Sequence, residues 1–392
     1  MYIDQIAPVL YSTPWDIPFD QRIAMLRRGS PRAAYYYSTP DTSTFRYRAY
    51  NVAQSLAALQ TGTGPSASWF TEADLDAMPR VLDSCDLLIL CRNSLYTDRV
   101  ARIAAMARAR HRRILFDVDD LVFDQRYTHL VMDTLNQNMS DETVWNYWFS
   151  YIGRVAATFE LCDGAIVTNG YLSEFAINYS RKPVRIIKNY LNREQQDLSA
   201  RIWNVKHKTR WRRDGLVHIG YFSGSPSHDR DFQVAAPALA RLMDRNPSVR
   251  LRIVGFLKLG ANLARYSHRI ETIPLQDFLN LQREKGFVEI NIVPLQENQF
   301  TNCKSDLKWF EAAIVGTLTI ASPTYAYSQA IAHGGNGWLS HAGNWEHVLA
   351  DVVDNLDELR PRIAPRAREE ALDRYGSGQQ VADIAAALFE SW

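Results

Sequence analysis

The sequence predicts an α/β protein with two Rossmann-like, doubly wound domains that face each other across a cleft. Short runs of β-branched and aromatic residues alternate with longer amphipathic segments, which is typical of βαβ units and parallel sheets. This alternation occurs twice, on either side of a polar stretch near 190–215 that carries no strand signal. The chain of 392 residues also exceeds the usual size of one hydrophobic core. We therefore expect two sheets, one in each half of the chain.

In the first half, apolar or aromatic runs bounded by polar residues are predicted to be strands. They are AAYYYS (33–38), DLLILC (86–91), RILFDV (113–118), GAIVTN (164–169) and VRIIKN (184–189). The predicted helices between them include RYRAYNVAQSLAALQ (46–60) and LYTDRVARIAAMARAR (95–110). In VWNYWFSYIGRVAATFELCD (144–163) the aromatic residues recur at helical spacing, which favours packing against the core or a partner over a platform for sugars.

The second half repeats this organisation. Its predicted strands are VHIGYFSG (217–224), VRLRIVG (249–255), FVEINIVPL (287–295) and LTIAS (318–322). Its predicted helices include DFQVAAPALARLMDRN (231–246) and KSDLKWFEAAIVG (304–316). We place the N-terminal domain at 1–200, the C-terminal domain at 201–375 and a final helix at 376–392.

The composition excludes several classes of protein. Hydrophobic residues make up 46% and charged residues 22%, which is ordinary for a globular protein, and the net charge of +1 provides no basic field for nucleic acid. The four cysteines lack metal-ligand spacing and suit a reducing cytoplasm. The N-terminus lacks the apolar stretch of a secretory signal, and no apolar run approaches a membrane span. We expect a cytoplasmic protein; the basic run ARARHRR (107–113) leaves open a weak peripheral contact with the membrane.

A candidate anion site lies in NCKSDLKWFEAA (302–313), directly after a predicted strand. On a helix, Lys304, Lys308 and Glu311 fall within one narrow sector. Ligands of open parallel sheets bind beyond the carboxyl ends of the strands, where helix N-termini also point. We therefore expect the first turn of this helix to offer both lysines to an anion. The alternative is a solvated charged face.

A second candidate follows the strand 217–224, in SGSPSHDRDF. Gly224 and Ser225 would let backbone N–H groups approach a phosphate, and Arg230 would supply a forked donor. The alternative is a simple turn between strand and helix, with Ser227 or Asp229 as the N-cap.

Acidic residues end the predicted strand 113–118. Asp117, Asp119 and Asp120 in FDVDD could coordinate a divalent cation, cap a helix, form hinge contacts or bind an acceptor hydroxyl. The sequence contains no GxGxxG after the first strand, no GxxxxGK[ST], no GxSxG and no HExxH. These absences argue against nicotinamide dehydrogenases, P-loop nucleotide hydrolases, serine hydrolases and zinc proteases of the common types.

Several of these segments resemble GT-B glycosyltransferases, and are most similar to the family 4 group. They are CDGAIVTNGYLSEFAINYSRKPVRIIKN (162–189), HIGYFSGSPSHDRDF (218–232), VRLRIVG (249–255) and NCKSDLKWFEAAIVGTLTIASPTYAYSQAIAHGGNGWL (302–339). The resemblance implies that Glu311 is the second glutamate of the E-x7-E motif and binds the donor ribose. It also implies that the diphosphate binds Gly224, Ser225, Arg230, Lys304 and Lys308. Cys303 stands where the first glutamate is expected, which suggests a divergent subgroup.

The resemblance implies a transferase that moves a sugar from a nucleotide diphosphate sugar to a carbohydrate or lipid-linked acceptor, with retention of configuration, in bacterial polysaccharide assembly. It needs no cofactor, and we expect no metal, because lysines and helix N-termini can stabilise the leaving diphosphate. Its final helix would cross back to the N-terminal domain. We place Arg46, Arg48 and the FDVDD carboxylates on the acceptor side of the cleft and assign no catalytic residue. A nucleotide-sugar epimerase of the same architecture and an inactive nucleotide-sugar-binding module are the alternatives.

Overall fold

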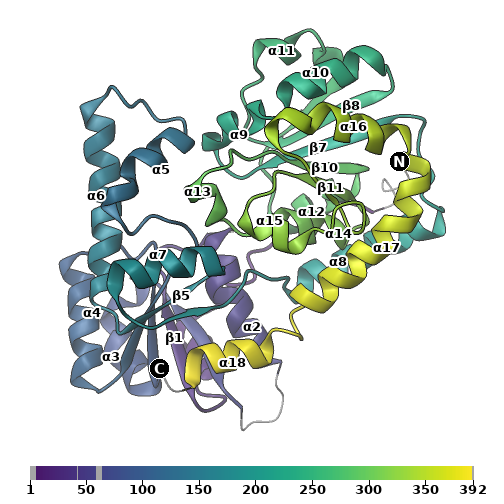
Figure 1. Ribbon diagram of the computed structural model, residues 1–392. Coiled ribbons are helices and arrows are strands. Elements are labelled where there is room, and N and C mark those ends of the chain that lie inside the picture. The colour runs from purple at the N-terminus through teal and green to yellow at the C-terminus, as the bar shows by residue number, and fades with distance from the viewer. Residues whose placement is uncertain (1–5, 42, 59–63, 391–392) are drawn as a thin grey trace.

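Two parallel six-stranded sheets form the centres of two α/β domains (Figure 1). This computed structural model describes residues 6–41, 43–58 and 64–390. The N-terminal sheet contains β1 (Arg32–Tyr36), β2 (Ser66–Phe70), β3 (Leu87–Cys91), β4 (Arg113–Asp117), β5 (Gly164–Val167) and β6 (Val184–Ile186). The C-terminal sheet contains β7 (Val217–Ser223), β8 (Val249–Gly255), β9 (Ile270–Ile273), β10 (Ile290–Val293), β11 (Leu318–Ala321) and β12 (Trp338–Leu339). All nine predicted strands are present, and β2, β9 and β12 were not predicted.

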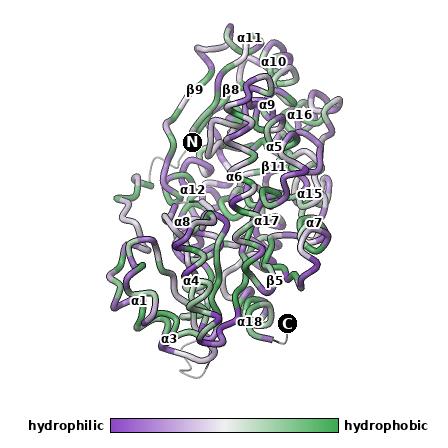
Figure 2. The backbone as a smooth tube through the Cα atoms, turned by 90° about the vertical axis from the view of Figure 1, so that its left-hand side faces the viewer, coloured by the Kyte–Doolittle hydropathy of each residue, from purple (hydrophilic) through white to green (hydrophobic). Residues whose placement is uncertain are grey.

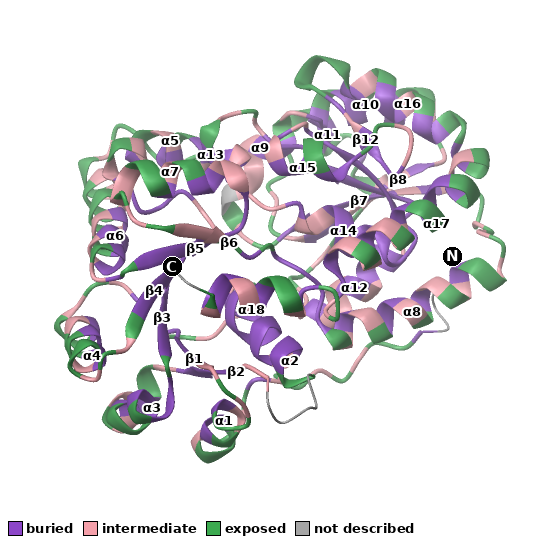
Figure 3. Cartoon of the chain, turned by 60° about the horizontal axis from the view of Figure 1, so that its bottom comes forward, coloured by how far each residue is buried: buried purple, intermediate pink, exposed green. Residues whose placement is uncertain are grey.

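Both sheets are doubly wound. Their strand orders are β2-β1-β3-β4-β5-β6 and β12-β11-β10-β7-β8-β9, and every pairing is parallel. Figure 3 shows β3 and β5 as buried along their length, and β4 is buried after its exposed first residue, Arg113. Strands of this kind are apolar without alternation because helices cover both faces of the sheet. The strand orders also show where each sheet reverses its winding direction. The reversal lies between β1 and β3 in the N-terminal sheet and between β7 and β10 in the C-terminal sheet.

The helices cover the faces of these sheets. In the N-terminal half they are α1 (Phe19–Leu26), α2 (Asn51–Ala57), α3 (Met78–Ser84), α4 (Asp98–Ala109), α5 (Thr128–Thr134), α6 (Glu142–Glu160) and α7 (Gly170–Ser180), and a π-helical turn at Arg46–Tyr50 precedes α2. The others are α8 (Arg193–Lys208), α9 (Asp229–Gln233), α10 (Ala236–Arg245), α11 (Ala261–Ala264), α12 (Phe278–Gly286), α13 (Gln299–Asn302), α14 (Leu307–Ala313), α15 (Tyr325–Ala330), α16 (Trp345–Asp354), α17 (Leu356–Tyr375) and α18 (Val381–Phe389). The last two residues of the predicted helix 46–60 lie outside the described residues. No helix in the described part of the chain is long and apolar enough to cross a membrane.

The aromatic segment 144–163 forms most of α6, and its two halves differ. Ile152, Val155 and Phe159 in the second half are buried against the N-terminal core. Tyr147 and Phe149 in the first half are 63% and 53% exposed. Trp148 and Tyr151 are partly buried against the same core, so the prediction of core packing holds along one side of α6 but not for Tyr147 and Phe149.

The polar stretch between the domains is a helix rather than an extended linker. Asn192 begins α8 with a capping box, in which its side chain accepts a hydrogen bond from the Gln195 backbone N–H. The helix packs against α12 of the C-terminal domain, so residue 200, our predicted boundary, falls within a continuous element. In Figure 2, which views the two domains one above the other, α8, α12 and α17 lie at the level of their junction.

The end of the chain returns to the N-terminal domain. Figure 1 shows α17 running down from the C-terminal domain to α18. There α18 contacts α2, and the Arg185 side chain donates a hydrogen bond of 2.6 Å to the backbone carbonyl of Ala386. Residues 391–392 of the predicted final helix lie outside the described residues.

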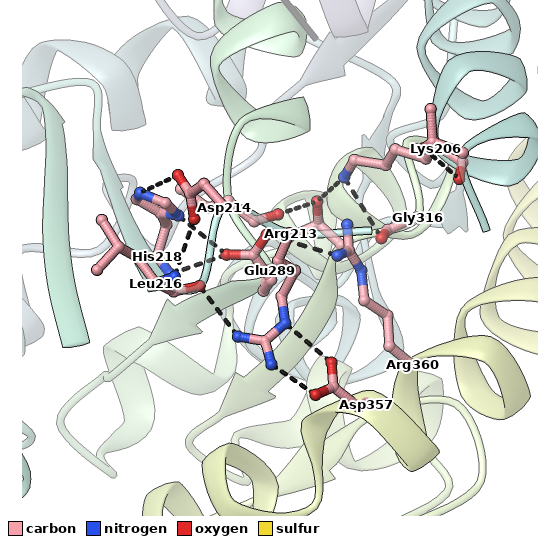
Figure 4. Close-up of polar contacts among 12 residues, drawn as sticks. Lys206, Arg213, Asp214, Leu216, His218, Glu289, Gly316, Asp357 and Arg360 are labelled. Carbon is pink, nitrogen blue, oxygen red and sulfur yellow. Dashed lines mark hydrogen bonds and ion pairs between the residues drawn. The ribbon is translucent and has the colours of Figure 1, made fainter. Parts of the chain in front are cut away.

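A buried charge network anchors α8 and α17 to the C-terminal sheet, at the end of the sheet opposite the cleft (Figure 4). Glu289 is fully buried, accepts a hydrogen bond of 2.8 Å from the His218 backbone N–H and pairs with Arg360 at 3.4 Å. Burial alone would raise the pKa of Glu289, but the hydrogen bonding by His218 and the charge of Arg360 leave it below its usual value. Lys206 of α8 donates a hydrogen bond of 2.9 Å to the Thr317 hydroxyl and forms no ion pair with the residues described here, and burial lowers its pKa well below the usual range.

We expect Lys206→Met to increase the free energy of unfolding by about 1 kcal/mol, because it removes a buried amine for which the described residues supply no carboxylate at ion-pair distance. The pKa of Lys206 is lower in the folded chain than in the unfolded chain. Its destabilising effect is therefore full below the folded pKa and disappears above the unfolded pKa. Wild-type stability should rise with pH through this window, and the methionine variant should lose this rise. Urea unfolding at pH 7 and pH 9 measures it, with the exposed Lys208→Met as the control; a less stable Lys206→Met would refute the argument.

Candidate active site between the two domains

A cavity of about 200 Å³ lies between the domains. The N-terminal half contributes Ser43, Thr44, Arg46, Tyr47, Asp119 and Asn189 to its lining. The C-terminal half contributes Phe222, Ser223, Gly224, Leu275, Gln276, Phe278, Leu281, Lys285, Leu307, Lys308 and Glu311. The site is therefore shared, with mostly polar residues from the first domain and both apolar and charged residues from the second.

The topology explains the position of the cavity. The segment after β1 supplies Ser43, Thr44, Arg46 and Tyr47, and the end of β7 supplies residues 222–224. Each of these strands lies where its sheet reverses winding direction, which leaves a crevice beyond the carboxyl ends of the strands. Two such crevices face each other here.

The predicted cationic helix begins later than expected. A short helix, α13, ends at Asn302, and α14 begins at Leu307, so Lys304 lies in the turn between them. Lys304 is 3.6 Å from an Asp120 carboxylate oxygen and does not line the cavity. The expectation that Lys304 occupies the first turn of this helix was wrong, because Asn298 begins a separate short helix that ends at Asn302, and Lys304 follows its C-cap, Cys303.

Lys308 lies in the first turn of α14 and lines the cavity. Its ammonium group is 5.4 Å from the centre of the Tyr221 ring. Burial lowers the pKa of Lys308 to about 8, and the nearby charges of Lys285 and Lys304 contribute. Within residues 6–41, 43–58 and 64–390 the ammonium has no hydrogen bond and no ion pair. Lys308 is thus a cation that faces the cavity with no carboxylate at ion-pair distance among the described residues, and the charges of Asp231 and Glu311 act on it only from farther away.

The loop after β7 is only partly at the cavity. Gly224 lines it and is exposed, with open space where a Cβ atom would stand. Ser225 and Arg230 are outside the lining. Arg230 instead reaches the N-terminal domain, where it pairs with Asp133 and donates 2.9 Å to the Asn136 side chain. A phosphate role for Ser225 and Arg230 remains a prediction.

Glu311 lines the cavity but is only 2% exposed. Its carboxylate pairs with Lys285 of α12 and accepts hydrogen bonds from Tyr47 and from Gln195, the latter at 3.1 Å. Arg46 is 3.4 Å away. Burial would raise the pKa of Glu311, but the charges of Lys285 and Arg46 lower it to about 2. Glu311 is therefore a permanent anion in the cleft wall.

The predicted acceptor-side arginines are buried in ion pairs. Arg48 is 1% exposed and forms a two-pronged contact with Asp117, at 2.7 and 2.9 Å. Neither residue lines the cavity. Arg46 does line it, and donates a 2.7 Å hydrogen bond to the Gln195 side chain. The structure thus brings Arg46 to the cleft and places Arg48 with Asp117 behind its wall.

The other two FDVDD carboxylates differ in position. Asp119 lines the cavity, accepts a 3.0 Å hydrogen bond from Thr44 and lies 3.1 Å from Arg92. Its Oδ1 atom is buried and receives no well-oriented hydrogen bond from the described residues. Asp120 pairs with Arg92 at 2.6 Å and is not part of the lining. Burial raises the pKa of Asp119, although Arg92 opposes this.

The described residues contain no group of three or more His, Cys, Asp or Glu side chains that could hold a metal ion. Cys303, at the position of the missing glutamate, is fully buried, and burial raises the pKa of its thiol. It is absent from the cavity lining.

Several lining residues were not predicted from the sequence. Ser43 and Thr44 follow β1 and could have been found from the rule that ligands bind beyond the carboxyl ends of strands. Lys285 lies in α12, a helix that was not predicted from the sequence. Tyr47 lies in the turn before α2, and in the sequence it cannot be distinguished from an aromatic residue of the core. No local pattern marks either residue as part of a shared site.

No family model matches the sequence of this chain, and no curated protein matches it. Solved structures do match. HepE of Anabaena, solved with UDP and glucose, has a TM-score of 0.60 at 13% identity and covers 91% of this chain and 98% of its own. Sucrose-phosphate synthase of Thermosynechococcus elongatus has a TM-score of 0.58 at 14% identity, covering 91% and 97%. WaaG, a glycosyltransferase involved in lipopolysaccharide biosynthesis, has a TM-score of 0.58 at 12% identity, covering 92% and 100%.

The protein has the GT-B fold. At these identities the likeness describes the fold and leaves the chemistry to the residues of the site. In this GT-B chain, Lys308 and Gly224 lie on the C-terminal side of the cavity, and Thr44 and Asp119 on the N-terminal side.

Proposed function

We propose that the protein is a glycosyltransferase that moves a sugar from a nucleoside diphosphate sugar to a carbohydrate or lipid-linked acceptor in bacterial glycan assembly. The observation that carries this proposal is the cavity between the carboxyl ends of two parallel sheets, lined by Lys308, which forms no ion pair within the described part of the chain. The GT-B fold supports it, as does the solution of HepE with UDP-glucose.

On the donor side, the diphosphate binds at Lys308 and at the backbone of Gly224. Departure of the nucleoside diphosphate leaves negative charge on a phosphate oxygen, and a fixed cation at that point lowers the barrier. The apolar residues of the C-terminal wall, such as Phe222 and Leu281, suit the flat faces of the nucleoside. Lys304 supports the site through Asp120 rather than through direct contact in this arrangement.

On the acceptor side, Asp119 accepts the proton of the reacting hydroxyl. The O–H bond of the acceptor breaks, its oxygen bonds to the anomeric carbon, and the bond from that carbon to the phosphate oxygen breaks with its electron pair on the diphosphate. Burial, which raises the pKa of Asp119, makes this carboxylate a stronger base. The Thr44 hydroxyl donates a hydrogen bond to the Oδ2 atom of this carboxylate. We propose retention of configuration from the family resemblance, which in this single displacement requires the acceptor oxygen to approach the anomeric carbon from the face that the phosphate leaves; NMR of the product anomer measures it.

The first experiment is a product analysis with labelled donors. UDP-glucose is the first donor to test, followed by other nucleoside diphosphate sugars, with methyl glycosides and lipid-linked glycans as acceptors. A glycoside product supports the proposal. An epimerised nucleotide sugar would identify an epimerase, and binding without turnover of any donor would identify a nucleotide-sugar-binding module.

Transfer should continue after treatment with EDTA, because Lys308 already supplies positive charge to the leaving group. The assay compares initial rates before and after chelation and after the addition of magnesium or manganese. Complete loss of activity that either metal restores would contradict this expectation. It would make the FDVDD carboxylates candidate metal ligands.

We also propose that any contact with a membrane is peripheral. The exposed aromatic half of α6, with Tyr147 and Phe149, belongs to the acceptor-side domain and is a more suitable candidate for such contact than the run 107–113. Flotation with lipid vesicles measures this contact.

A further inference from the structure

The Glu311 carboxylate receives hydrogen-bond donors from three separate segments. Its Oε1 atom accepts from the Tyr47 hydroxyl and from Gln195 Nε2 at 3.1 Å, and it lies 3.4 Å from Arg46 Nη2. Its Oε2 atom pairs with the Lys285 ammonium. Each carboxylate oxygen offers about two lone-pair sites, so three donors crowd Oε1, and Oε2 keeps at most one site beside Lys285 for the two hydroxyls of a ribose.

The donors belong to both domains. Arg46 and Tyr47 lie in the π-helical turn after β1, whereas Lys285 and Glu311 lie in α12 and α14 of the C-terminal domain. Gln195 lies in the first turn of α8, between the two sheets. If the domains separated, Glu311 would keep Lys285 and lose the donors of the N-terminal domain. Separation would cost the hydrogen bonds from Tyr47 and Arg46, so the network favours the closed cleft.

Ring contacts across the same junction tie this network to the cavity. The Arg46 guanidinium lies 4.0 Å from the centre of the Tyr47 ring and 4.9 Å from that of Phe278. Tyr47 meets the ring of Phe310 edge to face, with centres 6.4 Å apart. Tyr47, Arg46 and Phe278 all line the cavity. The same residues therefore hold the two domains together and shape the donor site.

We propose that Glu311 is a positioning residue that clasps the two domains around the cavity, and that its carboxylate does not bind the donor ribose. This inference rests on the proposed function for the identity of the ligand. Glu311 acts through Tyr47, Arg46 and Lys285, and contributes to donor binding by keeping both walls of the cavity at the distance the donor requires.

A thermodynamic cycle separates a clasp from a ribose ligand. Dissociation constants of UDP, 2′-deoxy-UDP and 3′-deoxy-UDP are measured for the wild type and for Glu311→Gln by calorimetry. A clasp predicts that the substitution weakens all three nucleotides by the same factor, to within about twofold. A hydrogen bond from a ribose hydroxyl to the carboxylate predicts that either deoxy analogue loses about tenfold or more in the wild type and much less in the variant. That second result would overturn the inference.

Solution scattering tests the clasp without any ligand. The clasp predicts a larger average radius of gyration for Glu311→Gln and for Tyr47→Phe than for the wild type. The phenylalanine variant removes one hydroxyl and keeps the ring, so it tests the idea even if Glu311→Gln fails to fold. The matched control is Tyr266→Phe, because the Tyr266 hydroxyl bonds Ala240 and Asp244 within one domain.

The two proposals can fail separately. If UDP and the other nucleotides do not bind the wild type, the proposed function is wrong, while the scattering comparison still tests the clasp. If nucleotides bind and the scattering of both cleft variants equals that of the wild type, the clasp is wrong and the proposed function stands.

Discussion

Asp119→Asn is expected to lower kcat for sugar transfer by about 100-fold or more, the usual contribution of a positioned general base. The amide keeps the shape of the side chain and its contact with Thr44, but it cannot take a proton from the acceptor hydroxyl. The dissociation constant of UDP should change little, because the donor diphosphate binds at Lys308 on the other wall. Steady-state kinetics at saturating donor, with calorimetry for UDP, measures both quantities.

The control for this variant is Asp76→Asn, which neutralises an exposed carboxylate of the same domain. Transfer should be unaffected there. If Asp119→Asn kept its full kcat, the proton would have to leave by another path, such as the departing phosphate. If the variant instead lost UDP affinity to the same extent as activity, Asp119 would be needed for the shape of the cavity rather than for proton transfer.

Lys308→Met should weaken the binding of UDP by about 10- to 150-fold, which corresponds to the 1.5–3 kcal/mol of a hydrogen bond to a charged group. Methionine keeps most of the volume and the apolar stem of lysine and removes the charge. Lys258→Met, which removes an exposed positive charge from the same domain, serves as the control. If the wild type and Lys308→Met bound UDP with equal affinity, Lys308 would be a solvated charge and would not be a diphosphate ligand.

The same lysine predicts a pH dependence. Burial lowers the pKa of Lys308 to about 8, so below that pH the ammonium is charged and above it the amine is neutral. The affinity for UDP should therefore fall as pH rises from 7 to 9, because a neutral amine no longer attracts the diphosphate. Lys308→Arg should bind UDP with little pH dependence over this range, since arginine stays protonated. A wild-type affinity that is flat between pH 7 and pH 9 would contradict this account.

The fold could largely be predicted from local patterns. The run LLILC and the centre of RILFD are apolar without alternation because both faces of a parallel sheet are covered, and this pattern can be recognised without knowing the partner strands. The strands that were not predicted show where local patterns are insufficient. β2 (SASWF) mixes small polar residues with aromatics, and β12 consists of Trp338 and Leu339 alone. Their strand character comes from pairing with a neighbour that is distant in the sequence.

The candidate site was predicted in its type and only partly in its members. Lys308, Gly224, Glu311, Arg46 and Asp119 line the cavity, as a site beyond the carboxyl ends of strands requires. Lys304, Arg48 and Asp117 are occupied by ion pairs outside it. A charged residue looks the same in sequence whether its partner is a ligand or another side chain, and partners such as Arg48 and Asp117 are 69 residues apart in the chain.

The sequence by itself determined the class of the protein: two doubly wound domains, lysines after a strand of the second domain, and carboxylates after a strand of the first. Hydrophobic periodicity and strand–helix order act over a few residues, so they can be read locally. Only the tertiary structure decided which charges remain available. It left Lys308 without an ion pair to any residue that the structure describes, and it surrounded Glu311 with Tyr47, Gln195 and Lys285. The physical reason is that electrostatic pairing and burial depend on distances between segments far apart in the sequence, which exist only once the two domains have packed.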